Sequence, residues 1–246
     1  MEASAAASGP PVREQSGRRL HGAILLATGV MAVYQGWVLF AGEPNNQAVA
    51  LGFFASGALA AAAVAGRARL LTLLREMRPR RRFVVVGGLG AVLVETFFWA
   101  AEQATGATGV AASPNLAIDL LVTMPWYLLM LTLLWKVLTR YRYTLPQLLL
   151  LGGVYELGAD GLLASFFGGQ LGPGLIVLLP VFFPIFIVVY GAIILPAALA
   201  LRDELATWPR PGEPPSRGRK ALYGLLPLLG LLPYALIVGP LLLLGG

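Results

Sequence analysis

The sequence predicts an all-α membrane protein, a single bundle of about seven transmembrane helices with its N-terminus inside the cell and its C-terminus outside. Two observations carry this prediction. First, 57% of the residues are hydrophobic and only 12% are charged, against roughly 25% charged residues in soluble domains. Second, the apolar residues gather in blocks of about twenty, the length that crosses the hydrocarbon core of a bilayer as a helix.

Polar and basic segments divide the chain into a tail and a transmembrane domain. Residues 1–20 are rich in Ala, Ser, Gly and Pro, a composition typical of a disordered segment, here placed in the cytoplasm. Residues 21–246 form the single transmembrane domain. Its expected spans are residues 21–41, 48–66, 83–101, 116–135, 145–167, 175–201 and 221–244.

The basic residues indicate the orientation of the spans. Three of the 18 precede the first expected span, seven lie between the second and third, three between the fourth and fifth, and five between the sixth and seventh. With seven alternating spans, all four basic segments lie on one face, which the positive-inside rule identifies as cytoplasmic. The localisation that follows is the cytoplasmic membrane, and the net charge of +6 gives no reason to expect a nucleic-acid partner.

The segment Arg67–Arg82 is expected to contact lipid. Leucines and one methionine alternate there with seven arginines, as in an interfacial helix that lies on anionic headgroups. A cytoplasmic continuation of the second span is the alternative.

Small residues predict two packing faces. On the second span they are Gly57, Ala58, Ala61, Ala62 and Ala65, and on the third Gly87 and Ala91. Their spacing lets a neighbouring helix approach closely.

Five acidic residues within or beside the expected spans are the candidate binding site for a substrate or ion: Glu95, Glu102, Asp119, Glu156 and Asp160. A carboxylate in hydrocarbon costs at least a few kcal/mol, so such residues usually face an interior cavity and usually have a role. No Lys or Arg lies inside any expected span to pair with them. Some should therefore be protonated or bind a cation. The alternative is that they form structural hydrogen bonds with Thr, Tyr or Trp.

Helical spacing groups these acids. Glu156 and Asp160 are four residues apart, and Glu95 and Glu102 are seven apart, so each pair shares a helical face. The acids belong to three consecutive expected spans, which predicts one carboxylate-lined cavity open to the outside. Glu156 is the leading candidate because it lies deepest.

Three functions are compatible with such a cavity. The first is transport of a small solute linked to protons or cations. The second is acid-base catalysis on an isoprenoid or carotenoid-like lipid, for which no catalytic residue can be assigned. The third is a membrane scaffold or assembly factor, in which the acids are dispensable. We expect no cofactor and no metal, because His21 is the only histidine and cysteine is absent.

A short stretch adds weight to the enzyme alternative. The residues from Glu102 to Gly109, followed by Pro125 and Trp126, resemble the E-x5-T-G and P-x-x-W region of seven-helix carotenoid hydratases. This resemblance implies an activity on apolar polyene lipids. The rest of the chain has no such match.

The topology can be tested with reporter fusions. Fusions after Asn46, Ser113 and Gly172 should read as extracytoplasmic, because each follows an odd number of spans. Those after Arg80, Tyr141 and Pro214 should read as cytoplasmic. A cytoplasmic signal at Ser113 would contradict the expected order of spans.

Overall fold

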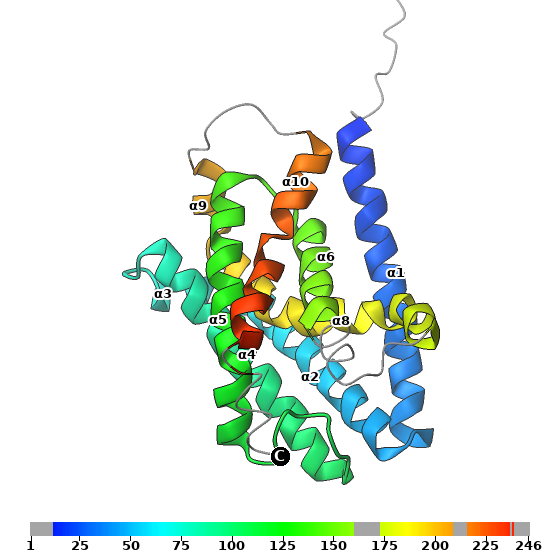
Figure 1. Cartoon of the computed structure of the whole chain (residues 1–246). Coiled ribbons are helices and arrows are strands. Elements are labelled where there is room, and N and C mark those ends of the chain that lie inside the picture. Colours follow the sequence, from blue (N-terminus) through cyan, green and yellow to red (C-terminus); the bar gives the residue numbers. More distant parts are fainter. Residues whose placement is uncertain (1–11, 160–172, 209–215, 237, 239–246) are drawn as a thin grey trace, which may run out of the picture.

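A computed structural model describes residues 12–159, 173–208, 216–236 and 238 (Figure 1). Within these residues it contains helices and no strand, which confirms the all-α prediction. The α-helices are α1 (Val12–Ala41), α2 (Pro44–Ala65), α3 (Arg67–Leu73), α4 (Pro79–Thr105), α5 (Leu116–Arg140), α6 (Leu145–Glu156), α8 (Pro173–Leu199), α9 (Arg202–Thr207) and α10 (Arg217–Gly224). A 3₁₀-helix, η2 (Leu226–Gly230), follows α10.

Five helices of the described chain are long and apolar enough to cross a membrane. They are α2, α4, α5, the part of α1 from Arg19 to Ala41, and the part of α8 from Val181 to Leu199. These five correspond to the first four expected spans and to the sixth. The membrane character predicted from composition is supported to this extent.

The other two expected spans are divided. In the region 145–167, α6 has 12 residues, a length of about 18 Å that falls short of the roughly 30 Å of hydrocarbon. A π-helical turn at 157–159 follows it, and residues 160–167 lie outside the described chain. In the region 221–244, η2 separates α10 from a helical segment at 231–236. The count of seven spans and the sides of the two termini therefore stay predictions.

The N-terminal boundary differs from the expected one. Helix α1 begins at Val12, so residues 12–20 are helical where the composition suggested a disordered tail. Residues 1–11 lie outside the described chain.

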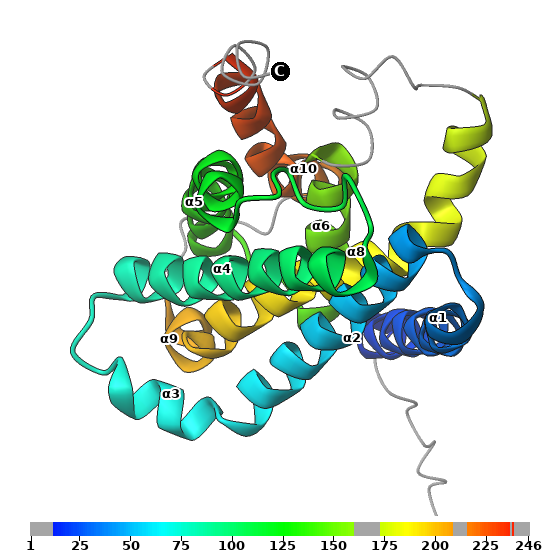
Figure 2. The same cartoon turned by 90° about the horizontal axis from the view of Figure 1, so that it is seen from below.

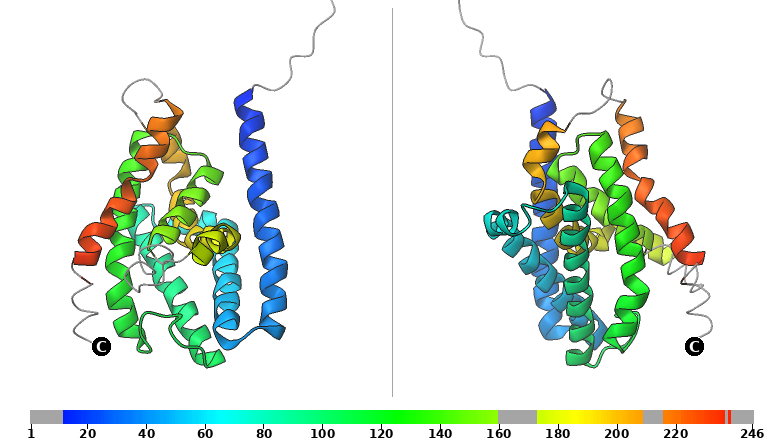
Figure 3. Two further views of the ribbon diagram at one scale, coloured as in Figure 1. Left: turned by 45° about the vertical axis from the view of Figure 1, so that its right-hand side comes forward. Right: turned by 90° about the vertical axis from the view of Figure 1, so that its left-hand side faces the viewer.

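Helix α8 lies at the centre of the bundle. It packs against α2, α4 and α6, and less extensively against α1 (Figure 2). Its segment Val181–Leu199 is the most apolar and most buried of the five candidate spans. A helix that is apolar on every side needs neighbours on every side, and its place between the other helices follows from that requirement. Helix α1 forms one edge of the bundle and residues 217–236 the opposite edge (Figure 3).

Glycines allow the helices to approach α8 closely. A Cβ atom on Gly90 of α4 would lie 3.1 Å from the carbonyl oxygen of Ala192 and 3.2 Å from the Cα of Ile193. One on Gly152 of α6 would lie 3.2 Å from the Cβ of Tyr190. A larger residue at Gly90 would therefore push against the backbone of α8, which cannot move aside as a side chain can.

The predicted packing face of α4 is confirmed. Ala91 is fully buried, and a Cβ on Gly87 would lie 2.5 Å from the Leu131 side chain of α5.

The packing face expected on α2 is wrong for most of its length. Ala58, Ala61, Ala62 and Ala65 are exposed. The buried residues of α2 lie nearer its start: Ala48, Ala50, Gly52, Phe53 and Ser56. The C-terminal end of α2 leads away from the bundle toward α3 (Figure 2), and of the expected face only Gly57 is partly buried, next to Val188 of α8.

Hydrogen bonds bring basic segments together at one end of the bundle. Arg67, after α2, donates to the carbonyl oxygen of Leu199 in α8. Arg142, after α5, donates to the carbonyl oxygen of Ala206 in α9. At the other end, Asn45 and Thr108 exchange two hydrogen bonds that join the start of α2 to the loop after α4. This arrangement is compatible with a common face for the basic segments.

Replacement of Gly90 by Ala or Leu should destabilise the bundle. Overpacking of a close-packed site costs about 1–3 kcal/mol, and the loss should be greater for Leu because its side chain must displace the α8 backbone. The measurement is thermal unfolding in detergent. Ala62→Leu, on the exposed part of α2, is the matched control and should unfold at the wild-type temperature; an equal effect of the two leucines would contradict the α4–α8 contact.

Candidate functional site

The structure separates the candidate acids into distinct environments. Glu95 and Glu102 lie on α4, two helical turns apart, and Asp119 lies in the first turns of α5. Glu156 is the last residue of α6 and is buried. Asp160 lies outside the described residues.

Glu102 and Asp119 hold the loop that joins α4 to α5. One carboxylate oxygen of Glu102 accepts hydrogen bonds from the backbone N–H groups of Val110 and Ala111, both at 2.7 Å. Asp119 accepts from the next N–H group, that of Ala112, also at 2.7 Å. Both acids are buried, at 6% and 0% exposure. Two carboxylates therefore bind three consecutive amides, which gives these acids a structural role.

The loop has a defined shape in addition to this clamp. Gly106 and Gly109 adopt positive φ angles of 71° and 75°, a region that glycine occupies without steric cost. The indole of Trp99 donates to the carbonyl oxygen of Pro114 at 2.8 Å. Asn115 caps the start of α5 by accepting from two backbone amides. The segment between α4 and α5, which is rich in Thr, Gly and Ser, thus forms an ordered turn.

Glu95 has a different environment, inside the bundle. The hydroxyl of Tyr127, on α5, donates a short hydrogen bond to Glu95. Tyr127 is 4% exposed, whereas Glu95 is partly buried. This pair joins α4 to α5 within two apolar helices.

A second polar pair lies beside the first. The indole N–H of Trp126 donates to the hydroxyl of Tyr190 on α8 at 2.7 Å, and both residues are buried. The ring centroids of Tyr127 and Tyr190 are 5.6 Å apart. Because the Tyr190 oxygen accepts from Trp126, its own proton can be donated to another acceptor. Glu95, Tyr127, Tyr190 and Trp126 form what we call the Glu95 cluster, at the junction of α4, α5 and α8.

The backbone of α5 is interrupted beside this cluster. Pro125, directly before Trp126 and Tyr127, lies inside the helix. A proline has no N–H group, so the carbonyl of Leu121, four residues earlier, loses its helical donor. Leu121 and Pro125 lie on the exposed face of α5, whereas Trp126 and Tyr127 are buried.

The sequence identified Glu95, and the alternative reading that such acids form hydrogen bonds with Thr, Tyr or Trp agrees with the bond from Tyr127, but it did not indicate which tyrosine is the partner. Nothing in the spacing of Tyr127 and Tyr190 along the chain connects them to Glu95, because they lie on two other helices. The adjacent pair Trp126 and Tyr127, after a proline in an apolar helix, was an available signal.

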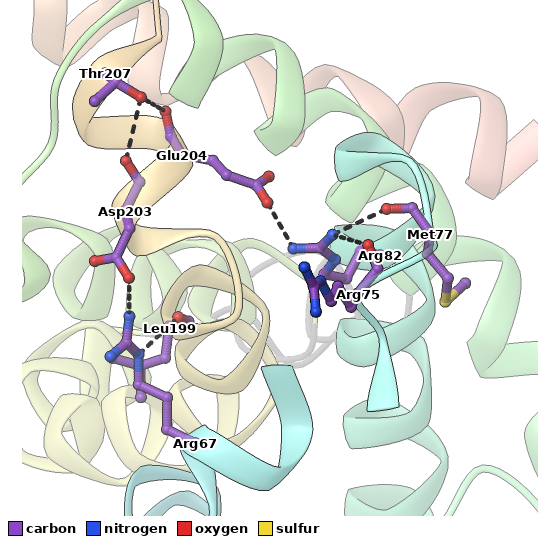
Figure 4. Close-up of polar contacts among 8 residues, drawn as sticks. All are labelled: Arg67, Arg75, Met77, Arg82, Leu199, Asp203, Glu204 and Thr207. Atoms are coloured by element: carbon purple, nitrogen blue, oxygen red, sulfur yellow. Dashed lines mark hydrogen bonds and ion pairs between the residues drawn. The ribbon is translucent and has the colours of Figure 1, made fainter. Parts of the chain in front are cut away.

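Two ion pairs at the basic end of the molecule were also not expected. Arg67 pairs with Asp203 at 2.8 Å and Arg82 with Glu204 at 2.7 Å, which ties the segment Arg67–Arg82 to α9 (Figure 4). The guanidinium of Arg82 is buried and also donates to the backbone oxygens of Arg75 and Met77. Here too the partners are far apart in the sequence.

In the described part of the chain, no group of three or more His, Cys, Asp or Glu side chains is placed to hold a metal ion. No protein-family model, curated protein or solved structure matches the chain. The chemistry of the site must therefore be inferred from its own residues.

Loss of the Glu102 carboxylate should loosen the loop between α4 and α5. Glu102→Ala removes the acceptor for two buried amides, and hydrogen bonds to a charged group contribute about 1.5–3 kcal/mol each. Hydrogen exchange at Val110 and Ala111 should accelerate, and the melting temperature should fall. Glu43→Ala, at an exposed acid, is the control. Unchanged exchange at both amides would show that Glu102 does not hold the loop.

Proposed function

We propose that the chain is a multi-pass protein of the cytoplasmic membrane that couples the movement of a small solute to protons or another cation. Glu95 is the residue that takes up and releases the ion. The observation that carries this proposal is the hydrogen bond from Tyr127 to Glu95 inside two apolar helices. It supports an ion-binding role because the pair suits both charge states of the carboxyl group.

The chemistry of the pair explains this. When Glu95 is an anion, the Tyr127 hydroxyl donates to it and stabilises the charge in a medium without water. When Glu95 is protonated, its own O–H can donate to the tyrosine oxygen, since a phenol both donates and accepts. An acid that merely fastened two helices would need only one of these states.

The surroundings of the pair suit movement of an ion. Tyr190 adds a second hydroxyl on the central helix α8, and Pro125 interrupts the hydrogen bonding of α5 directly before Trp126 and Tyr127. Membrane transporters commonly place interrupted helices at their ion sites, because freed backbone groups there can interact with the ion. Pro184 and Pro196 interrupt the hydrogen bonding of α8 as well, which lowers the resistance of that helix to bending.

Glu156 is a second candidate for the ion-binding acid. It is buried at the end of α6, next to Tyr155, whose hydroxyl donates to the carbonyl oxygen of Gly224 at 2.6 Å. This bond fixes the end of α6 against the C-terminal segment. Whether Glu156 exchanges an ion is tested beside Glu95.

The test is charge movement across a membrane. Proteoliposomes of the full chain on a solid support are subjected to a pH jump, and separately to a sodium jump at constant pH. We expect a transient current in the wild type for one of the two ions. Glu95→Gln keeps the shape of the side chain but cannot titrate, so it should lose most of the current. Tyr127→Phe should keep a current with a shifted pH dependence, since it removes only the donor.

Controls make this test decisive. Glu76→Gln alters an exposed acid and should leave the current intact, and all variants must match the wild type in melting temperature. Glu156→Gln shows whether the second acid takes part. A full current in Glu95→Gln would overturn the proposed role of Glu95, and the absence of any ion-driven current in the wild type would favour the enzyme or scaffold alternatives.

A further inference from the structure

A cavity of about 410 Å³ lies at the basic end of the molecule, and no residue of the Glu95 cluster lines it. It is enclosed by the turn between α5 and α6 and by the end of α8 with α9. Its volume falls in the range of sites that hold small ligands or parts of larger ones. The residues that line it include Leu138, Leu148, Ala198, Tyr141, Arg142 and Arg202.

The lining changes character from the interior to the surface. Leu138, Leu148 and Ala198 are buried and apolar. Arg142 and Arg202 are exposed, so the two positive charges lie at the rim. An apolar interior beneath a cationic rim matches a ligand that has a hydrocarbon part and an anionic head.

The two rim arginines have no carboxylate partner in the described part of the chain. The acids nearest in sequence to Arg202 are Asp203 and Glu204, and these pair with Arg67 and Arg82 (Figure 4). Arg142 makes a hydrogen bond to the backbone oxygen of Ala206, which leaves its charge uncompensated. The ion pairs of α9 thus remove the local acids and keep the rim of the cavity positive.

The neighbouring tyrosine keeps the site free of negative charge. The hydroxyl of Tyr143, which also lines the cavity, donates to the carbonyl oxygen of Lys220 at 2.7 Å. A phenol is already neutral at physiological pH, and burial raises the pKa of Tyr143 further, to about 12, so this residue adds no negative charge to the cavity. The Lys220 ammonium lies 4.6 Å from the centre of the Tyr143 ring and adds a further positive charge nearby.

We propose that this cavity binds an anionic amphiphile, with the phosphate or carboxylate head between Arg142 and Arg202 and the start of the hydrocarbon chain against Leu138 and Leu148. Guanidinium groups bind such oxyanions well, because their N–H groups match the geometry of the anion. Basic pockets between helices at the cytoplasmic side of membrane proteins bind lipid headgroups in this way. The site is separate from the ion-binding role of Glu95 and does not depend on it.

Lipid titration tests this site on the delipidated full chain in a nonionic detergent. Phosphatidylglycerol and phosphatidylcholine with the same acyl chains are added separately, and the melting temperature and the bound lipid, counted by native mass spectrometry, are followed. Phosphatidylglycerol should bind saturably and raise the melting temperature, whereas phosphatidylcholine should not. In Arg142→Gln/Arg202→Gln the affinity for phosphatidylglycerol should fall about tenfold or more, since two charge-assisted contacts are lost.

A matched double variant controls for nonspecific attraction between the anionic lipid and the basic protein surface. Arg69→Gln/Arg80→Gln removes two exposed arginines from the same end of the molecule but outside the cavity. Its affinity should stay within about threefold of the wild type, because charges outside the cavity act through solvent that screens them. Equal losses in the two double variants would overturn the proposal. If Arg142→Gln/Arg202→Gln fails to fold, Arg202→Gln alone serves, since the Arg202 side chain makes no hydrogen bond within the described residues.

Two further measurements distinguish binding of an amphiphile from binding of a free anion. Leu145→Trp places a bulky ring at the rim, where Leu145 is 39% exposed, and should weaken lipid binding with both arginines present. Inorganic phosphate alone should give no comparable rise in melting temperature. Protection by phosphate equal to that by phosphatidylglycerol would assign the site to a soluble anion and overturn the role of the apolar interior.

Discussion

The close packing of α8 against α4 and α6 is the contact on which the rest of this structure depends. Gly90 and Gly152 make it possible, because a side chain at Gly90 would meet the backbone of α8 and one at Gly152 would meet Tyr190. Within lipid there is no hydrophobic drive to bring helices together, so close van der Waals contact between small residues has to supply the attraction. The position of α8 in turn places Tyr190 beside Tyr127 and carries α9 to the basic end.

A second constraint is the cost of charge inside apolar helices, which the chain meets in two ways. At the loop after α4, Glu102 and Asp119 accept hydrogen bonds from three backbone amides. These amides belong to the chain itself, so the arrangement is fixed once the protein is folded. Inside the bundle, Glu95 has a tyrosine hydroxyl instead, a partner that can either donate or accept. The first solution suits a permanent structural role, and the second suits a group that changes its protonation state.

Features that depend on consecutive residues could be predicted from the sequence, and contacts made only by tertiary packing could not. The apolar blocks predicted four of the candidate spans nearly residue by residue, because the length of a span is a property of consecutive residues. The break after Glu156 was missed, since apolar composition alone does not distinguish a continuous helix from short segments. The break at η2 lies at Pro227, a residue without the N–H group that a continuous helix needs. Among the acids, composition identified the unusual residues but not their partners. Tyr127, Tyr190 and the amide of Ala112 become neighbours only through tertiary packing, as do Arg67 and Asp203.

The central helix also connects the two proposed sites. Tyr190 of the Glu95 cluster and Ala198 of the cavity lie eight residues apart on α8, about 12 Å along the helix axis. Beyond Ala198 the chain enters α9, whose acids are bound by Arg67 and Arg82. A shift of α8 along its axis would therefore alter the Tyr127–Tyr190 contact and the cavity wall together. The glycine contacts set how far such a shift can go, because Gly90 faces backbone atoms of α8 rather than a side chain that can adjust.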